Sequence, residues 1–247
     1  MGEPDPGDPR TAELAAALAR VRERIAAAAT TAGRDPAGIS LIAVTKFFPA
    51  ADVARLARLG VGDVGENREQ EATAKHAELG GAGRSAGVAG LRWHMIGQLQ
   101  TNKVRAVLGW ADTVQSVDRS KLVHALSRSA EQAGRELDCL IQVDLDRSGS
   151  AAGRGGAGPA QAPGLAGLVA QSPGLRLRGL MAVAPDGVDP APAMRELARV
   201  HRQVLVEHPG AGWLSAGMSN DLEQAVAVGA THVRIGSALL GPRPVLG

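Results

Sequence analysis

A single lysine stands at the end of an apolar run that has the composition of a buried strand. The run covers residues 41–45, and Lys46 closes it. Partial burial lowers the pKa of an amine, and a neutral amine can attack a carbonyl carbon to form a Schiff base. The alternative is that the side chain of Lys46 simply extends into solvent at the strand end. The position therefore indicates carbonyl chemistry and leaves a surface lysine as the competing interpretation.

Small residues follow the last two predicted strands. Gly217 and Ser219 follow the run at 213–216, whereas Gly236 and Ser237 follow a run that ends at 235. In α/β barrels the loops after the seventh and eighth strands commonly bind phosphate, through backbone N–H groups. Glycine lets the backbone approach a ligand closely, and serine adds a hydroxyl. The two loops therefore predict a phosphate site, with ordinary turns as the alternative.

Three further polar residues lie on or after predicted strands. The guanidinium of Arg234 has hydrogen-bond donors and no acceptor, so it would leave a pyridine nitrogen that faces it unprotonated. The alternative is that Arg234 forms a salt bridge across the mouth of the barrel. Asn67 either projects into the mouth or caps the next helix, and its residue type favours the cap. His94 could act as an acid or base, but a histidine hydrogen-bonded inside the barrel is the commoner arrangement.

These residues together match the groups of one ligand. Pyridoxal 5′-phosphate (PLP) has an aldehyde for Lys46, a phosphate for the two small loops and a ring nitrogen for Arg234. The pattern therefore favours PLP as the cofactor. A cofactor-free barrel enzyme, in which Lys46 forms a Schiff base with a sugar phosphate, is the alternative.

Eight short β-rich runs alternate with helical stretches along the chain. Their centres lie near residues 42, 64, 94, 115, 142, 180, 214 and 234. This alternation predicts a parallel sheet, and eight such units in 247 residues have the size of a (β/α)8 TIM barrel. A doubly wound open sheet is the alternative, although no GxGxxG motif follows the first strand. In a barrel the C-terminal strand ends meet at one face, which would bring the candidate residues together.

An extra helix is expected before the first strand. Four apolar residues repeat at the spacing of one helix face: Leu14, Leu18, Val21 and Ile25. The pattern predicts a helix over 11–33, capped by Thr11 and ended by Gly33.

The chain is expected to consist of a short tail and one domain. We expect residues 1–10 to form a disordered tail and residues 11–247 to form a single barrel domain. The Gly/Ala/Pro-rich residues 147–164 are expected to form a mobile loop.

Composition excludes several classes of function. The 27 basic and 25 acidic residues leave a net charge of +2, too little for a nucleic-acid-binding surface. The single cysteine, Cys139, excludes internal disulfides and cysteine-rich zinc sites. The uncharged residues 155–175 are interrupted by prolines and glycines, so no membrane span is expected. The first ten residues contain no apolar signal region, and we expect a cytoplasmic protein.

Several motifs together resemble a known family. They are Ala43-Val44-Thr45-Lys46, Gly65-Glu66-Asn67 with Gln70-Glu71, Trp93 to Gly97 with Leu99 to Lys103, Gly179-Leu180-Met181, Leu214-Ser215 with Gly217-Met218-Ser219 and Asp221, and Val233 to Gly236. In order and spacing they resemble the YggS/PROSC family of pyridoxal-phosphate homeostasis proteins, over nearly all of residues 11–241.

The resemblance implies a barrel similar to the N-terminal domain of alanine racemase, a fold-type III PLP protein. It implies that Lys46 carries PLP as an internal aldimine and that Arg234 faces the ring nitrogen. The residues that it implies around the phosphate are Ser215, Ser219, Gly236 and Ser237, and those that it implies along the cofactor are Asn67, Met181 and Met218. The chain departs from the family at Arg68, where an aromatic residue is usual, and at Asp144, where an asparagine is usual.

Two features argue against efficient catalysis. A PLP racemase needs an acid/base on each face of the substrate carbon, and this chain contains no tyrosine to supply one of them. An arginine at the ring nitrogen also weakens the electron sink. We therefore expect a monomeric PLP-binding homeostasis protein, with PLP-dependent apoenzymes as possible recipients and no catalytic residues. A weak PLP-dependent racemase that uses Lys46 as its only base is the alternative.

Overall fold

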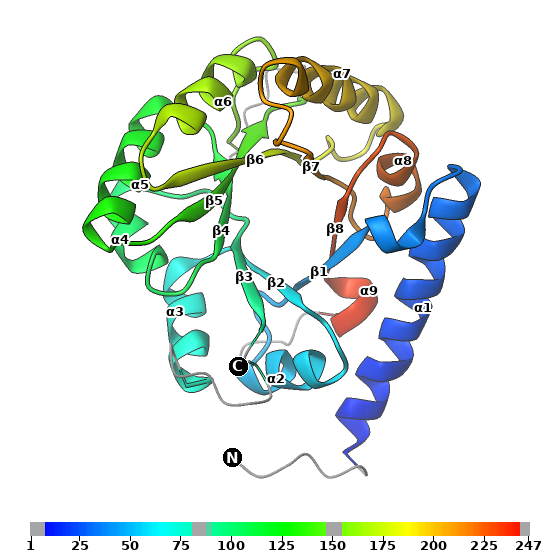
Figure 1. Ribbon diagram of the computed structural model, residues 1–247. Coiled ribbons are helices and arrows are strands. Elements are labelled where there is room, and N and C mark those ends of the chain that lie inside the picture. Colours follow the sequence, from blue (N-terminus) through cyan, green and yellow to red (C-terminus); the bar gives the residue numbers. More distant parts are fainter. Residues whose placement is uncertain (1–7, 81–87, 89, 147–154, 243–247) are drawn as a thin grey trace.

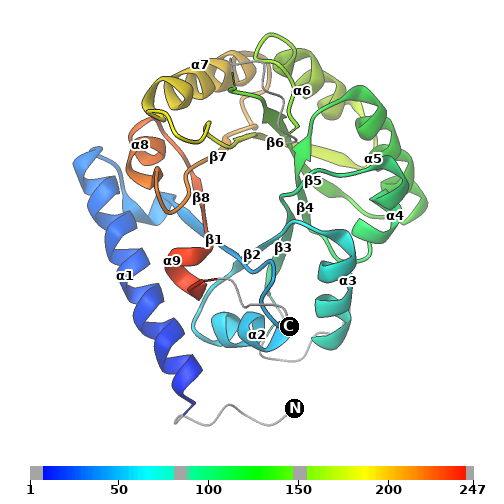
Figure 2. The ribbon, with the colours of Figure 1, turned by 180° about the vertical axis from the view of Figure 1, so that it is seen from behind.

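Eight parallel strands form a closed barrel in the computed structural model. The structure describes residues 8–80, 88, 90–146 and 155–242. Each strand pairs with its neighbour in sequence order, and β8 pairs with β1 to close the barrel (Figure 1). The predicted (β/α)8 barrel is therefore confirmed, and the alternative of an open doubly wound sheet is wrong. The view from behind shows the helices surrounding the ring of strands (Figure 2).

The strands are β1 Ser40–Val44, β2 Asp63–Glu66, β3 Arg92–Met95, β4 Thr113–Val117, β5 Leu137–Val143, β6 Leu175–Ala182, β7 Trp213–Ser215 and β8 His232–Ile235. The helices are α1 Pro9–Thr31, α2 Ala50–Arg58, α3 Glu69–Glu78, α4 Val104–Val107, α5 Ser120–Gln132, α6 Ala162–Gln171, α7 Ala191–Glu207, α8 Leu222–Ala227 and α9 Ser237–Leu240, with 3-10 turns at Pro36–Gly38 and Thr101–Lys103. All eight predicted strands are present. Helix α9 was not predicted from the sequence.

Helix α1 begins earlier than its apolar pattern predicts. Asp8, and not Thr11, is the N-cap, and its carboxylate accepts a hydrogen bond from the backbone N–H of Arg10. The Arg10 guanidinium then binds the Asp52 carboxylate at 2.8 Å and the backbone carbonyl of Leu240 at 3.0 Å. The expectation of a disordered tail over residues 1–10 is therefore wrong for residues 8–10, because tertiary contacts hold them. Residues 1–7 lie outside the described residues.

Two further predictions concern the C-terminal end of α1 and the segment 147–164. Gly33 follows the last turn of α1 with a φ of +65°, a conformation that favours glycine, so its predicted role at the helix end is confirmed. Part of the segment 147–164, expected to be a mobile loop, is ordered: Ala157 bridges to Val143 of β5, and α6 begins at Ala162. Residues 147–154 lie outside the described residues.

A close backbone approach joins the ends of β2 and β3. A Cβ atom at Gly97 would lie 2.2 Å from the carbonyl oxygen of Asn67 and 2.7 Å from its Cα. We expect Gly97→Ala to lower the free energy of unfolding by about 1–3 kcal/mol, because the new methyl must displace backbone. Urea unfolding measures the effect. Gly62→Ala is the matched control, since a Cβ there meets no atom within 4 Å; equal stability of the two variants would contradict the prediction.

Candidate functional site

A cavity of about 420 Å³ opens at the carboxyl ends of the strands. The loops after β1, β6, β7 and β8 form its walls. Six of the nine predicted site residues line it: Lys46, Met218, Ser219, Arg234, Gly236 and Ser237. The loop after β6, including Asp186 and Val188, also lines the cavity and was not predicted to do so from the sequence. Its position after a strand was the available signal, because such loops form the mouth of a barrel.

Lys46 lies in a tight turn directly after β1. Strand β1 ends at Val44, two residues before the predicted strand end, and the backbone N–H of Phe48 donates to the carbonyl of Thr45 at 3.0 Å. Phe47 has a φ of +72°, and it is the one described residue other than glycine with a positive φ. The side chain of Lys46 is half-buried at the cavity wall. The turn therefore presents an amine to the cavity, as carbonyl chemistry requires.

The two small-residue loops also meet at this cavity. The hydroxyl oxygens of Ser219 and Ser237 lie 3.5 Å apart, although the residues come from loops after different strands. Gly217 adopts a φ of +92°, and a Cβ there would lie 2.7 Å from the Cβ of Ala225. Glycine is therefore required at position 217 for the loop to turn next to α8.

Arg234 provides a buried positive charge beside these loops. One guanidinium nitrogen donates to the carbonyl of Ser215 at 2.9 Å and to its hydroxyl at 2.8 Å, and the other donates to the carbonyl of Ala182 at 2.8 Å. Burial lowers the pKa of Arg234 to about 10, so the guanidinium remains charged at neutral pH. These three acceptors are neutral oxygens, and within the described residues the structure shows no salt bridge of Arg234 across the mouth.

Three predicted site residues, Ser215, Met181 and Asn67, are not among those that line the cavity. Ser215 is fully buried, and its hydroxyl donates to the side-chain oxygen of Gln115 at 2.7 Å while accepting from Arg234. Ser215 therefore supports Arg234, which differs from the phosphate contact that the resemblance implied. Met181 is buried on β6, where it pairs with Ser215. Asn67 is not the cap of α3, because Arg68 occupies that position.

A chain of hydrogen bonds continues from Ser215 through the barrel interior. Gln115 receives the hydroxyl of Ser215 at its oxygen, so its nitrogen donates to Nδ1 of His94 at 3.0 Å. The proton of the His94 ring therefore lies on Nε2, which donates to the Asp63 carboxylate at 2.8 Å. The interpretation of His94 as a hydrogen-bonded interior residue is confirmed. Gln115 was missed, although a glutamine inside an apolar strand was a visible signal.

His232, the first residue of β8, is expected to make the free energy of unfolding depend on pH. The His232 ring lies 4.4 Å from the Trp213 ring, and burial lowers the pKa of His232 to about 4. A histidine in the unfolded chain has a pKa of about 6.5, so the unfolded state binds more protons between these values. We expect the contribution of neutral His232 to the free energy of unfolding to be fully present above about pH 6.5. This contribution should fall toward pH 4 by up to about 1.4 kcal/mol per pH unit. Urea unfolding across this range should show a shallower slope for His232→Phe; an unchanged slope would contradict the assignment.

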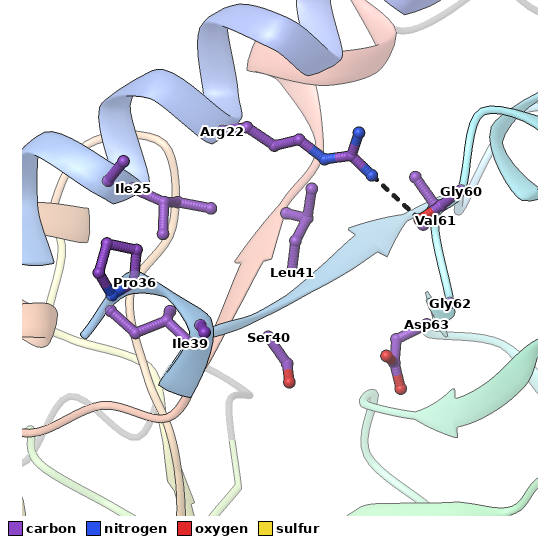
Figure 3. Close-up of a pocket in the computed structure, with 12 residues that line it drawn as sticks. Arg22, Ile25, Pro36, Ile39, Ser40, Leu41, Gly60, Val61, Gly62 and Asp63 are labelled. Atoms are coloured by element: carbon purple, nitrogen blue, oxygen red, sulfur yellow. Dashed lines mark hydrogen bonds between the residues drawn. The ribbon is translucent and has the colours of Figure 1, made fainter.

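A second cavity, of about 390 Å³, lies at the amino ends of β1 and β2 beside α1 (Figure 3). Arg22 at its edge donates to the carbonyl of Gly60 at 3.0 Å. The Asp63 carboxylate already accepts hydrogen bonds from Arg92 and His94. This cavity is lined by none of the nine predicted site residues. The cavity at the carboxyl ends is therefore the candidate functional site.

The described residues carry neither a membrane helix nor a metal cluster. No helix among them is long and apolar enough to cross a membrane. Within the same residues, no group of three histidine, cysteine or carboxylate side chains could hold a metal ion.

Comparisons with known proteins show which proteins this chain resembles. The sequence-family model named "Alanine racemase, N-terminal domain" matches residues 17–244 of this chain. A pyridoxal phosphate homeostasis protein of Mycobacterium tuberculosis is 47% identical over 243 residues, which are 95% of this chain and 94% of that protein. The structure of PipY from Synechococcus elongatus, solved with PLP bound, is 33% identical with a TM-score of 0.78, and the match covers 92% of this chain and all of that one.

A more distant structure shows the shared fold. Alanine racemase from Corynebacterium glutamicum is 15% identical with a TM-score of 0.63, and the match covers 96% of this chain and 62% of that one. The closed barrel and the match to the family model thus define a barrel of the alanine racemase N-terminal-domain type. Within that class, the chain belongs to the family of the pyridoxal phosphate homeostasis proteins.

Proposed function

We propose that the protein binds PLP in the cavity at the carboxyl ends of the strands and stores or supplies it. The observation that carries the proposal is the convergence of one amine, two hydroxyls and a buried guanidinium on one cavity. The volume of about 420 Å³ lies within the usual range for small-ligand sites. The names of the relatives, and the PLP in the PipY structure, support the same ligand.

The residues present fit the groups of PLP. The amine of Lys46 would hold the aldehyde end, and Ser219, Gly236 and Ser237 would hold the phosphate. Arg234 would face the ring nitrogen, and Met218 would line the ring. When bound, PLP supplies an aldehyde and an electron-withdrawing ring. Outside the lining, we assign Ser215 to orient Arg234. Asn67 and Met181, which the resemblance implied along the cofactor, are not among the lining residues.

We further propose that the protein lacks robust catalysis. The chain contains no tyrosine, so an acid/base of that type is not available on either face of a bound substrate. Arg234 donates hydrogen bonds and accepts none, which leaves a facing ring nitrogen without the proton that strengthens an electron sink. A carrier therefore fits the site better than a racemase does.

Transfer of the cofactor is the experiment that tests this proposal. The protein loaded with PLP is mixed with the apo form of a PLP-dependent enzyme, and the recovered activity of that enzyme is followed. We expect activity to return without catalytic exchange of the α-hydrogen of alanine with solvent by the loaded protein alone. Rapid α-hydrogen exchange would instead identify a racemase. PLP-dependent apoenzymes as partners, a monomeric state and a cytoplasmic location belong to the same proposal.

Helix α1 braces the proposed phosphate loop. The Arg24 guanidinium binds both oxygens of Glu223, at 2.6 and 2.7 Å, and donates to the carbonyl of Ser219 at 2.6 Å. We expect Arg24→Ala to weaken PLP binding by about three- to tenfold, because the loop loses its outer support. The free energy of unfolding should change by less than about 1 kcal/mol, since the ion pair is partly exposed to solvent. Equilibrium titration with PLP measures the effect.

The control for this variant is Arg20→Ala, on the exposed face of the same helix. An Arg24→Ala protein that binds PLP as tightly as the Arg20→Ala protein would show that α1 does not brace the loop.

A further inference from the structure

A buried ion cluster lies directly behind the turn that carries Lys46. All three protons of the Lys75 ammonium are used: they go to the Thr45 carbonyl at 2.7 Å, to Glu66 at 2.7 Å and to Glu71 at 2.6 Å. Glu66 also accepts the hydroxyl of Thr45 at 2.7 Å. Glu66 is fully buried, and the side chain of Lys75 is 8% exposed. None of the three charged residues lines the cavity.

The cluster holds both peptide groups that flank Lys46. Lys75 binds the carbonyl of Thr45, in the peptide before Lys46. Glu71 accepts the backbone N–H of Phe47, in the peptide after Lys46. Since a planar peptide on each side determines the direction of the Cα–Cβ bond between them, the cluster determines the direction in which the Lys46 side chain leaves the backbone.

The turn needs such support because one of its residues is strained. Phe47 has a φ of +72°, which costs a residue other than glycine about 1–3 kcal/mol and persists only where surrounding contacts enforce it. The hydrogen bond from Phe47 to Glu71 is one such contact. Strain of this kind concentrates at functional sites, and here it lies next to the proposed PLP lysine.

Burying the charged groups of this cluster costs free energy. Burial raises the pKa of Glu66, although Lys75 and Thr45 oppose that shift. The second carboxylate oxygen of Glu66 is buried and lacks a hydrogen-bond partner among the described residues. Apolar side chains of similar volume often stabilise a core as well as a buried ion pair does. A role in orienting the turn accounts for charged residues at this place.

We propose that Glu71 and Lys75 are positioning residues that hold the Lys46 amine toward the cavity by binding the two peptide groups beside it. The inference rests on the proposed function, because Lys46 is the residue that would bind PLP. It goes beyond that function by assigning a role to two residues that have no place in the cavity.

Two conservative variants of Glu71 test the proposal. Glu71→Gln keeps an oxygen at the reach of the Phe47 N–H but removes the charge, whereas Glu71→Asp keeps the charge but withdraws the oxygen by one methylene. We expect the rate of PLP binding to fall at least about tenfold in Glu71→Asp and to stay within about threefold of the original in Glu71→Gln, since orientation decides reactivity. Glu78→Asp, on the exposed end of the same helix, is the control.

A second readout does not depend on PLP. Reductive methylation with formaldehyde and cyanoborohydride, followed by peptide mass spectrometry, compares Lys46 with the exposed Lys121 in each protein. In Glu71→Asp the half-buried Lys46 amine is released toward solvent, so its methylation relative to Lys121 should rise while PLP binding slows. In Glu71→Gln the ratio should match that of the original protein.

The outcomes separate the two claims. If Glu71→Asp binds PLP and methylates as the original protein does, or if Glu71→Gln is the more impaired variant, the positioning role is overturned. If the original protein binds no PLP, the proposed function fails, and the methylation ratios alone then decide the positioning role.

Discussion

Replacing Lys46 with alanine is expected to eliminate covalent binding of PLP. The amine of Lys46 lies at the cavity wall, and among the described residues no other lysine lines that cavity. We expect the near-visible absorption of the loaded protein to disappear and the affinity for PLP to fall by at least about 100-fold, because the remaining contacts are noncovalent. Absorption spectroscopy and equilibrium dialysis measure the two effects.

The matched control is Lys121→Ala, which removes an exposed lysine on α5. A Lys46→Ala protein that kept the absorption would show that another lysine holds the cofactor. Unchanged affinity with lost absorption would show that the phosphate loops alone retain PLP.

Arg234→Met is expected to have the next largest effect. The change leaves the buried carbonyl oxygens of Ser215 and Ala182 without their donor. Since each unsatisfied buried group costs about 1–3 kcal/mol, we expect the free energy of unfolding to fall by about 2–4 kcal/mol. PLP affinity should fall by about tenfold as well, because a charged donor is lost from the cavity. Urea unfolding and titration with PLP measure these changes.

Arg202→Met, on the exposed face of α7, controls for the loss of one positive charge. Full PLP affinity in a folded Arg234→Met protein would show that the guanidinium does not contact the cofactor.

The barrel and the face of its site could be predicted from the sequence. Strands that alternate with helices require crossover connections, and eight such units close a barrel. The rule that carboxyl strand ends meet at one face then placed Lys46 on the same cavity as Ser219 and Ser237, although the two serines follow it by more than 170 residues. The shared face of these residues follows from the order of strands and helices alone, and the hydrophobic pattern of the sequence indicates that order.

Which side chains line the cavity and which point into the barrel interior could not be predicted in the same way. Ser215 and Ser219 belong to one motif, yet Ser215 points into the barrel toward Gln115 and Ser219 lines the cavity. Which side a residue takes at a short strand end depends on the exact residue at which the strand ends, and here β7 ends at Ser215 itself. Sequence patterns give such boundaries least reliably.

Contacts between distant elements were also missed. The bonds from Lys75 to the turn at Lys46 join α3 to the end of β1, and those from Arg10 join α1 to α2 and α9. Each residue has an ordinary helical environment in the sequence, because Thr45 is 30 residues from Lys75, and Asp52 and Leu240 are 42 and 230 residues from Arg10. Only the packing of the helices around the barrel reveals these roles.

The central claim is that PLP binds covalently to Lys46 in this cavity. Borohydride reduction of the loaded, unmodified protein, followed by peptide mass spectrometry, tests it most directly. The account predicts that the near-visible absorption disappears on reduction and that the pyridoxyl group is found on the peptide containing Lys46. A pyridoxyl group on any other lysine, or a protein that gains no absorption when PLP is added, would contradict it.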